Sequence, residues 1–308
     1  MSKQVLYVNP IQLDANPAID ALAYGLQHAL HAADIQMSVL FADFREPGYR
    51  KRYAAAIEAG IDAQVDGIVM YALDPTTFGD VVAKARAAGI PVFSFVRPHY
   101  PVNASVVYPN FNHGVFMAEY LASLLPPDSG VGVIGGPDTV DDAEEVAGLV
   151  YTLKRSHCRL LNDPEDQQFC NVQDVSAGAR APTLRLLESF PRSQIHGLIP
   201  YNDETMFGCV QVLEETGQLG DLKIVSRNGS PQAVEAVRAG KTAGTWDLDA
   251  SGIGTTLGAL VVRHLVGGEV LEDYMTMSPV GQMITQENID SWRPWSERVE
   301  WTPLSVGL

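Results

Sequence analysis

The 308-residue chain carries 37 acidic and 21 basic side chains, a formal net charge of −16 at pH 7. With 46% hydrophobic and 19% charged residues, it has the composition of a globular protein long enough for two domains, which excludes a disordered chain. The negative charge excludes a nucleic-acid partner, because a phosphate backbone requires a basic surface, and it disfavours an anionic membrane surface. No apolar run is long enough to span a membrane.

Short apolar strands alternate with amphipathic helices from the amino terminus onward. The predicted strands cover 5–8, 37–41, 67–71 and 91–96, and the predicted helices between them cover 17–30, 49–64 and 75–88. Asn16 followed by Pro17 is typical of a capped helix start. Because nearly continuous apolar strands are buried on both faces, this pattern predicts an α/β fold built on a parallel sheet.

The same alternation restarts after Asn110. Strands are predicted at 130–135, 195–199, 223–226 and 242–246, and helices at 115–125, 141–154, 179–189, after 202, at 232–239 and at 251–266. The chain therefore reads as two similar α/β halves, each of ordinary domain size. The junction at 107–110 contains no Gly/Ser tract, which predicts a hinge built from extended strands.

Motifs that would indicate an enzyme are missing from the sequence. Gly135-Gly136 follows a strand, but no dinucleotide-binding, P-loop or nucleophile-elbow pattern is present. The seven histidines show neither metal nor triad spacing. The acidic run at 141–145 opens a helix, where the helix dipole favours carboxylates. We therefore expect no catalytic residue, no metal and no cofactor.

Polar side chains recur where predicted strands end. Each one can be a helix cap or a turn residue, but together they would line one crevice between the two halves. Amide, guanidinium and carboxylate groups with a few aromatic rings suit a hydroxyl-rich ligand, since each hydroxyl both donates and accepts. The series is Asn9, Gln12, Asp14, Asn16, Tyr71, Asp74, Arg97, Asn110, Asp138, Asp141, Asp142, Asn202, Asp203, Asn228, Trp246, Asp247 and Asp249.

Four segments carry a resemblance to a known family. They are Tyr201-Asn202-Asp203-Glu204 with Gly208, Ala88-Gly89-Ile90-Pro91-Val92 before Arg97, Pro109-Asn110 with Gly114, and Asn228-Gly229-Ser230-Pro231. In this order the chain resembles the type I periplasmic binding proteins, in particular the ribose-binding-like, sugar-specific proteins of ABC importers. The resemblance implies two doubly wound parallel-sheet lobes joined by a three-segment hinge. It places 1–108 plus 247–275 in one lobe and 109–246 plus 276–308 in the other.

The resemblance also implies a ligand site. Positions that contact sugar in the family correspond to Asn16, Arg97, Asn202, Asn228 and Asp247, and Asn110 lies where the family crosses between lobes. Tyr71, Asp142 and Trp246 complete the predicted ligand-binding set.

The chain departs from the family pattern in several places. Ala18-Ile19 stands where a Phe pair is usual, and Val96 stands where an acidic residue commonly precedes Arg97. Ala143, beside Asp142 and Glu144, stands where an Arg is usual. Asn228 and Asp247 replace the usual Asp and Gln. These departures favour a small polyol, an unusual sugar or a sugar derivative, and the carboxylates also permit an amine-bearing ligand.

The function implied by the resemblance is that of a monomeric solute-binding protein without enzymatic activity. It would capture its ligand by closure of the lobes about the hinge and present it to the membrane permease of an ABC importer. It would act in the periplasm, its leader being absent from this sequence. The alternatives are a ligand-sensing domain of a receptor or of a LacI-type regulator, of which the regulator would need a DNA-binding segment before residue 5, and a sugar-processing enzyme.

The three cysteines admit different roles. Cys209 lies in an apolar helix and is expected to be a small buried hydrophobe. Cys158 and Cys170 bracket the polar insert 162–166, and they are either a disulfide or two free thiols. For a protein exported to the periplasm we expect the bridge between Cys158 and Cys170.

Overall fold

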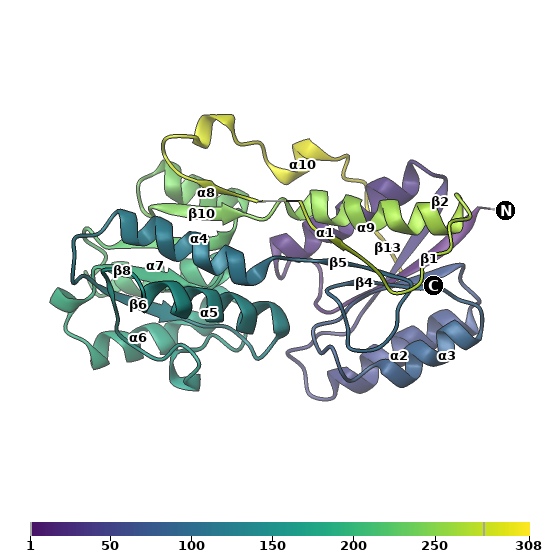
Figure 1. Cartoon of the computed structure of the whole chain (residues 1–308), viewed down its shortest axis with the longest axis horizontal. Helices are drawn as coiled ribbons and strands as arrows, with labels where there is room; N and C mark the ends of the chain where they lie inside the picture. The colour runs from purple at the N-terminus through teal and green to yellow at the C-terminus, as the bar shows by residue number, and fades with distance from the viewer. Residues whose placement is uncertain (1, 280) are drawn as a thin grey trace. The chain divides into compact units, whose positions relative to one another are not determined.

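The computed structural model describes residues 2–279 and 281–308, and the chain forms two compact units (Figure 1). The chain changes unit at 108/109, 248/249, 279/280 and 293/294. Unit 1 comprises Met1–Tyr108, Asp249–Pro279 and Pro294–Leu308, and unit 2 comprises Pro109–Leu248 and Val280–Arg293.

Unit 1 is built on a seven-stranded parallel sheet in the order β11-β5-β4-β3-β1-β2-β13. The strands are β1 (Lys3–Asn9), β2 (Ile35–Phe41), β3 (Gly67–Tyr71), β4 (Val92–Phe95), β5 (Ala104–Val107), β11 (Tyr274–Met277) and β13 (Ser305–Val306). The helices that cover its faces are α1 (Pro17–His31), α2 (Tyr49–Asp62), α3 (Gly79–Ala87) and α9 (Ala250–Leu265), and α10 (Trp295–Arg298) is a short helix near the carboxyl terminus.

Alternating side chains of this sheet build two apolar layers. Leu6 and Ile68 point to one face, where they pack with Tyr53 and Ile57 of α2. On the other face α1 and α9 pack against each other so closely that a Cβ added at Gly25 would lie 2.0 Å from a backbone oxygen of α9. Figure 1 shows α2 beside α3 and α1 beside α9. The helices on both faces bury every residue of the central strands β3 and β4, which explains why these strands are almost entirely apolar in the sequence.

Unit 2 is built on a six-stranded sheet in the order β12-β10-β9-β8-β6-β7, parallel except for the pair β10–β12. The strands are β6 (Gly130–Ile134), β7 (Arg159–Leu160), β8 (Gly197–Pro200), β9 (Lys223–Asn228), β10 (Gly244–Asp247) and β12 (Gln282–Ile284). The α-helices are α4 (Asn110–Ser123), α5 (Val140–Leu153), α6 (Arg180–Ser189), α7 (Asp203–Glu215) and α8 (Pro231–Arg238). Single 3₁₀ turns are η1 (Gln167–Phe169), η2 (Ser176–Ala179), η3 (Arg192–Gln194) and η4 (Ile289–Ser291).

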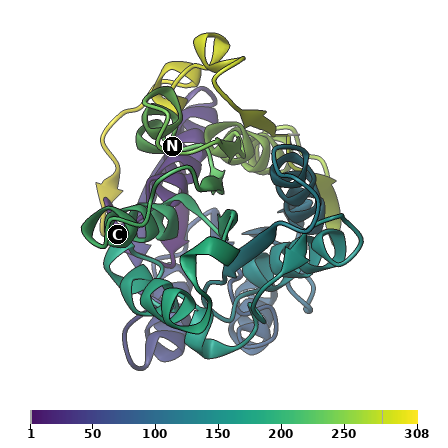
Figure 2. The same ribbon diagram turned by 90° about the vertical axis from the view of Figure 1, so that its left-hand side faces the viewer.

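The two faces of this second sheet carry separate cores. Val131 and Val133 pack with α4 and α5, whereas the alternate residue Ile134 packs with α6 and α7. Figures 1 and 2 show the helices that flank this sheet. Helices on both faces of each sheet confirm the predicted α/β fold with two doubly wound sheets.

The end of the chain differs from the prediction. Residues 294–308 belong to unit 1, although the family resemblance implied that 276–308 lie in the second lobe. β13 pairs with β2, and Trp301 stacks on Tyr24 of α1 with ring centroids 4.3 Å apart. Trp295 of α10 is fully buried. Residues 276–279 also lie in unit 1, because β11 pairs with β5, and Asp247 lies in unit 2, because it ends β10.

The predicted disulfide is wrong, since Cys158 and Cys170 are free thiols in the structure. Gly130, which starts β6, pairs with Arg159, while Gly135, just after β6, forms a bridge with Cys170. The two cysteines therefore flank opposite ends of β6. Because a strand rises about 3.3 Å per residue, the Cα atoms of the two cysteines lie roughly 20 Å apart. A disulfide requires a Cα separation of about 4.4–6.8 Å.

Candidate functional site

The loops after the parallel strands of unit 2 emerge at one edge of its sheet. Gly136 follows β6, Asn202 follows β8, Arg227 lies at the end of β9, and Asp247 ends β10. We call this region, together with the first turns of α4 and α5, the unit 2 edge. Most of its polar side chains are buried, so their partners determine what the edge can bind.

Asn110, the first residue of α4, joins three charged side chains at the unit 2 edge. Its Nδ2 donates to Asp141 Oδ1 and to Glu144 Oε2, both at 3.1 Å. Its Oδ1 accepts from Arg227 Nη1 at 3.2 Å, and the same nitrogen lies 2.6 Å from Glu145 Oε2. The side chains of Arg227 and Glu145 are 8% and 0% exposed. A buried ion pair therefore fixes the orientation of the Asn110 amide.

Asp142, in the first turn of α5, is a buried carboxylate with one satisfied oxygen. Its Oδ2 accepts from the backbone N–H of Gly136 at 3.1 Å, and its Oδ1 has no hydrogen-bond partner among residues 2–279 and 281–308. Burial raises the pKa of Asp142 to about 7, the positive charge of Arg227 opposes this rise, and the negative charge of Asp174 adds to it. The carboxyl can therefore gain or lose its proton near neutral pH.

Asn202 caps a helix and also contributes to the unit 2 edge. Its Oδ1 accepts from Thr205 N at 2.9 Å and caps α7, while its Nδ2 donates to Asp174 Oδ1 at 2.6 Å. The hydroxyl of Tyr201 donates to the same carboxylate oxygen. Asn202 therefore caps α7 through its amide oxygen and contacts Asp174 through its amide nitrogen, because the two ends of one amide serve different partners.

Three other predicted residues of unit 2 take part in contacts within the unit. Asn228 ends β9 with a φ of 120°, and its carbonyl accepts from Leu248 N at 3.1 Å. Asp247 Oδ2 accepts from the indole of Trp292 at 2.9 Å. Trp246 is buried, and its ring stacks on Phe116 at a centroid distance of 5.1 Å. Trp246 is therefore packed into unit 2 and is not an open platform for stacking.

The corresponding edge of unit 1, which we call the unit 1 edge, holds Asn16 and Tyr71. Asn16 is buried, and its Oδ1 caps α1 by accepting from Ala18 N at 3.1 Å. Tyr71 ends β3 and packs against the rings of Phe95 and Tyr108. Asn9, at the end of β1, is fully buried, and its Nδ2 has no partner within the part of the chain that the structure describes.

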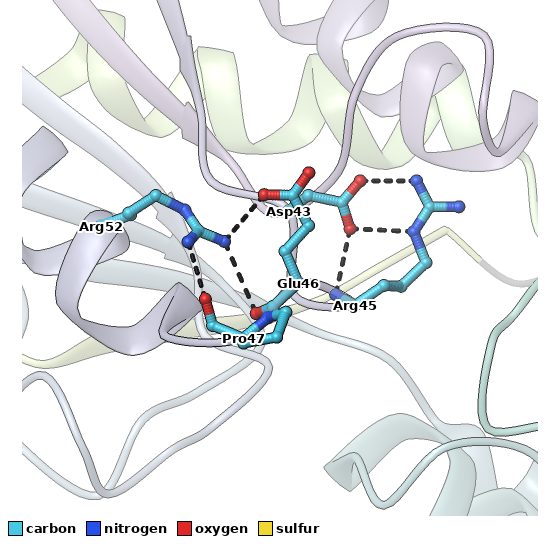
Figure 3. Close-up of polar contacts among 5 residues, drawn as sticks. All are labelled: Asp43, Arg45, Glu46, Pro47 and Arg52. Atoms are coloured by element: carbon cyan, nitrogen blue, oxygen red, sulfur yellow. Dashed lines mark hydrogen bonds and ion pairs between the residues drawn. The ribbon is translucent and has the colours of Figure 1, made fainter.

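The loop after β2 adds an ordered group of charges to the unit 1 edge (Figure 3). Asp43 Oδ1 accepts from the backbone N and the Nε of Arg45, at 3.0 and 2.8 Å. Arg52 Nη1 donates to the carbonyl of Pro47 at 2.8 Å, and its Nη2 lies 3.0 Å from Glu46 Oε2. Although burial opposes ionisation of Asp43, the hydrogen bonds from Arg45 lower its pKa. The loop therefore presents an oriented Arg45 at neutral pH.

Arg97 is the most exposed of the predicted ligand-binding residues. It follows β4, and its Nη2 donates to Asp273 Oδ2 at 2.8 Å, with side-chain exposures of 44% and 51%. The pair borders an open pocket of about 410 Å³ that His99 and Tyr100 also line. An exposed ion pair of this kind contributes about 0–1 kcal/mol, so Arg97 can exchange Asp273 for another acceptor at little cost.

The structure adds edge residues that the sequence did not single out as ligand contacts. Arg227 is a charged residue inside an otherwise buried strand, and this burial is the signal that could have identified it. Glu145 lies one helical turn after Asp141, which identifies the face of α5 that they share. Asp174 lies in an irregular loop before η2, and no sequence pattern brings it to Tyr201.

Among residues 2–279 and 281–308, no group of three or more His, Cys, Asp or Glu side chains is arranged to hold a metal ion. Within the same residues, no helix is both long enough and apolar enough to cross a membrane.

A family model described as a periplasmic binding protein domain matches residues 12–269. The chain belongs to this family. A xylitol-binding protein of Mycolicibacterium smegmatis is 25% identical over 243 residues, which cover 77% of this chain and 66% of the relative. A D-ribose/D-allose-binding protein of Pseudomonas aeruginosa is 24% identical over 200 residues, which cover 62% of this chain and 60% of the relative. The chain thus spans slightly less than two thirds of the length of each of these relatives.

Solved structures share the fold over almost the whole chain. A periplasmic solute-binding protein of an ABC transporter from Actinobacillus succinogenes, solved with bound D-allose, has a TM-score of 0.80 at 19% identity. It aligns over 94% of this chain and 100% of its own. A solute-binding protein from Bacillus halodurans, solved with bound myo-inositol, has a TM-score of 0.76 at 22% identity over 94% and 96% of the two chains. At these identities the likeness establishes the fold.

Proposed function

We propose that this chain is the solute-binding protein of an ABC importer and that it binds a small polyhydroxylated molecule, a sugar, polyol or sugar derivative. Family membership supports a binding protein rather than an enzyme. The two relatives named above are a xylitol-binding protein and a D-ribose/D-allose-binding protein, and the two solved structures hold D-allose and myo-inositol.

The observation that carries the proposal is the set of oriented polar groups at the unit 2 edge. The Asn110 amide is fixed by Arg227 and Asp141, and the Asn202 amide is fixed by Asp174. Oriented amides beside carboxylates can both donate to and accept from hydroxyl groups. Because these groups are already ordered, little conformational entropy is lost when a ligand binds.

We assign ligand contacts to both units. In unit 1 the proposed residues are Asn16, Tyr71 and Arg97, and the exposed guanidinium of Arg97 is the one most available to an incoming hydroxyl. In unit 2 they are Asn110, Asp142, Asn202, Asn228 and Asp247, whereas the predicted contact Trp246 supports the edge through packing.

The proposed setting follows from the importer role. The protein would act in the periplasm as a monomer and deliver its ligand to a membrane permease, without turnover of the ligand. Size-exclusion chromatography with light scattering tests the monomer, and product analysis after incubation with a bound sugar tests the absence of turnover.

A thermal-shift screen of the purified chain tests the proposal directly. The panel contains xylitol, D-ribose, D-allose and myo-inositol, with an amino-acid set as the comparison class. A ligand that binds only the folded state at a hundred times its Kd stabilises it by about 2.7 kcal/mol, which raises the apparent melting temperature. We expect at least one polyol or sugar to do so in a dose-dependent way. Stabilisation by amino acids alone would refute the proposal.

A further inference from the structure

The chain changes unit four times, and the last change, at 293/294, adds a connection to the three that the family resemblance implies. This connection lies between two tryptophans that belong to different units. Trp292 is in unit 2 and Trp295 is in unit 1, with Arg293 and Pro294 between them. We call residues 292–298 the carboxyl-terminal connector.

Each tryptophan of the connector is anchored in the core of its own unit. The ring of Trp292 packs against the unit 2 cluster that contains Ile284 and Ile289. Trp295, the first residue of α10, is 1% exposed, and α10 lies beside α9 in unit 1 (Figure 1). Because large buried side chains are costly to withdraw from a core, both ends of the connection at 293/294 are held in place.

The backbone between the two anchors is short and stiff. Pro294 has a φ of −53°, which its ring fixes, and a proline also restricts the residue before it, Arg293, to extended backbone. Trp295 follows Trp292 by three residue steps, so their Cα atoms can lie at most about 11 Å apart. The connection therefore has little capacity to lengthen or bend when the units move.

The connector is also bonded to the second change of unit, at 248/249, on both sides of that boundary. On the unit 2 side, Trp292 Nε1 donates to Asp247 Oδ2 at 2.9 Å. On the unit 1 side, Arg298 Nη1 donates to Asp249 Oδ1 at 2.9 Å. Only Leu248 separates the two carboxylate residues, so the crossing at 247–249 is held at each end by the same connector.

Neighbouring contacts leave the crossing at 247–249 little room to turn. The backbone N–H of Leu248 donates to the carbonyl of Asn228 at 3.1 Å, and Asp249 caps α9. A Cβ added at Gly281, just after the third change of unit, would lie 2.2 Å from the carbonyl oxygen of Asp247. On the unit 2 side, the second, third and fourth connections therefore run close together.

We propose that the carboxyl-terminal connector restrains the movement of the two units by holding Asp247 and Asp249 on either side of their crossing. Compact units joined by short connections move relative to each other by turning about the backbone angles of those connections. A crossing that is bonded at both ends to a second, stiff connection has fewer accessible backbone angles, so the units sample a narrower range of arrangements. The inference concerns the chain without ligand and does not depend on the proposed function.

Double electron–electron resonance on the ligand-free chain measures this range as the width of a distance distribution. Spin labels are attached at Ala55→Cys on α2 of unit 1 and at Ser123→Cys at the end of α4 of unit 2. Both positions are exposed, whereas the three native thiols are buried. The test variant is Trp292→Phe/Arg298→Met, which retains most of the apolar packing and removes both hydrogen bonds to the crossing. We expect its distribution to be broader by at least about 1.5-fold.

The matched control makes the same two replacements away from the crossing. It is Trp301→Phe/Arg263→Met, in which Trp301 stacks on Tyr24 and Arg263 pairs with Glu269, all within unit 1. Its distance distribution should be as wide as that of the labelled chain without either pair of replacements. An unchanged width in the test variant, or equal broadening in the control, would overturn the inference.

Hydrogen exchange on the single variants keeps the inference testable if the double variant does not fold. Trp292→Phe keeps a ring in the core, and Arg298→Met removes a pair whose side chains are 18% and 31% exposed, so each should fold. We expect the amide of Leu248 to exchange at least about threefold faster in each variant, because the crossing opens more often, while the amide of Val133 in β6 is unchanged. Unchanged exchange at Leu248 in both variants would overturn the inference.

Discussion

The buried pair between Arg227 and Glu145 gives the sharpest stability prediction. Arg227→Met retains most of the side-chain volume and removes the cation that lies 2.6 Å from Glu145 Oε2. Because Glu145 is fully buried, removing its partner strands a carboxylate away from water. Breaking such a pair costs about 3–5 kcal/mol. Asn110 also loses a donor, which adds about 1 kcal/mol.

The pH dependence of this cost has a definite sign. Burial raises the folded pKa of Glu145 well above its usual value, so above an unfolded pKa of about 4.3 the folded state binds more protons than the unfolded state. Stability is therefore lost as pH rises toward the folded pKa. Arg227→Met raises that pKa further, because it removes the opposing charge. The destabilisation should be smallest near pH 5 and largest near pH 8.

The assay is urea unfolding followed by circular dichroism at pH 5 and pH 8, with linear extrapolation. The control is the double variant Arg227→Met/Glu145→Leu, in which no charge is stranded. It should recover most of the lost stability, since apolar replacements of buried pairs are often neutral or stabilising. A loss below 1 kcal/mol at pH 8 for Arg227→Met, or no recovery in the double variant, would refute the reasoning.

Two further predictions concern packing and the thiols. Gly148→Ala should lower the free energy of unfolding by about 1–3 kcal/mol, because the added Cβ would lie 2.1 Å from the Phe111 carbonyl oxygen and force α4 and α5 apart. Urea unfolding measures this loss, with Ser123→Ala on the exposed surface as the control. An unchanged urea midpoint for Gly148→Ala would contradict the close packing of the two helices. Alkylation of the unfolded chain without reductant should modify all three cysteines, which mass spectrometry measures. If Cys158 and Cys170 react only after a reductant is added, the two thiols are not free and the structure is contradicted.

Much of the fold could be predicted because a strand that is buried on both faces must be apolar along its whole length, and such runs are visible in the sequence. Strands such as 67–71 are covered by helices on both faces, so their residues are almost all apolar, and the helices between them carry caps such as Asn16 and Ser230. β13 was missed because two exposed residues, Ser305 and Val306, carry no such pattern. The return of 294–308 to unit 1 depends on the stacking of Trp301 and Tyr24, which only the tertiary structure reveals.

The candidate site was predictable where a residue follows a recognisable strand. Asn110 and Asn202 meet that condition, and the structure places each among the polar groups of one edge. Asp174 could not be found in this way, because an irregular loop brings it to Asn202. The cysteine prediction failed for a related reason: sequence separation did not reveal that Cys158 and Cys170 flank opposite ends of β6.

Calorimetry of the tightest ligand from the screen, with Asn202→Ala and Arg97→Ala, tests the central claim most directly. Their matched controls are Asn288→Ala, which removes an amide bonded to the Met283 carbonyl, and Arg263→Ala, which removes an equally exposed ion pair. Losing a hydrogen bond to a ligand hydroxyl from a charged or oriented group costs about 1.5–3 kcal/mol, which corresponds to more than tenfold in affinity. We expect one ligand per chain and a loss of more than tenfold for Asn202→Ala and Arg97→Ala, with less than twofold for the controls. Unchanged affinity in Asn202→Ala and Arg97→Ala would contradict the proposed site.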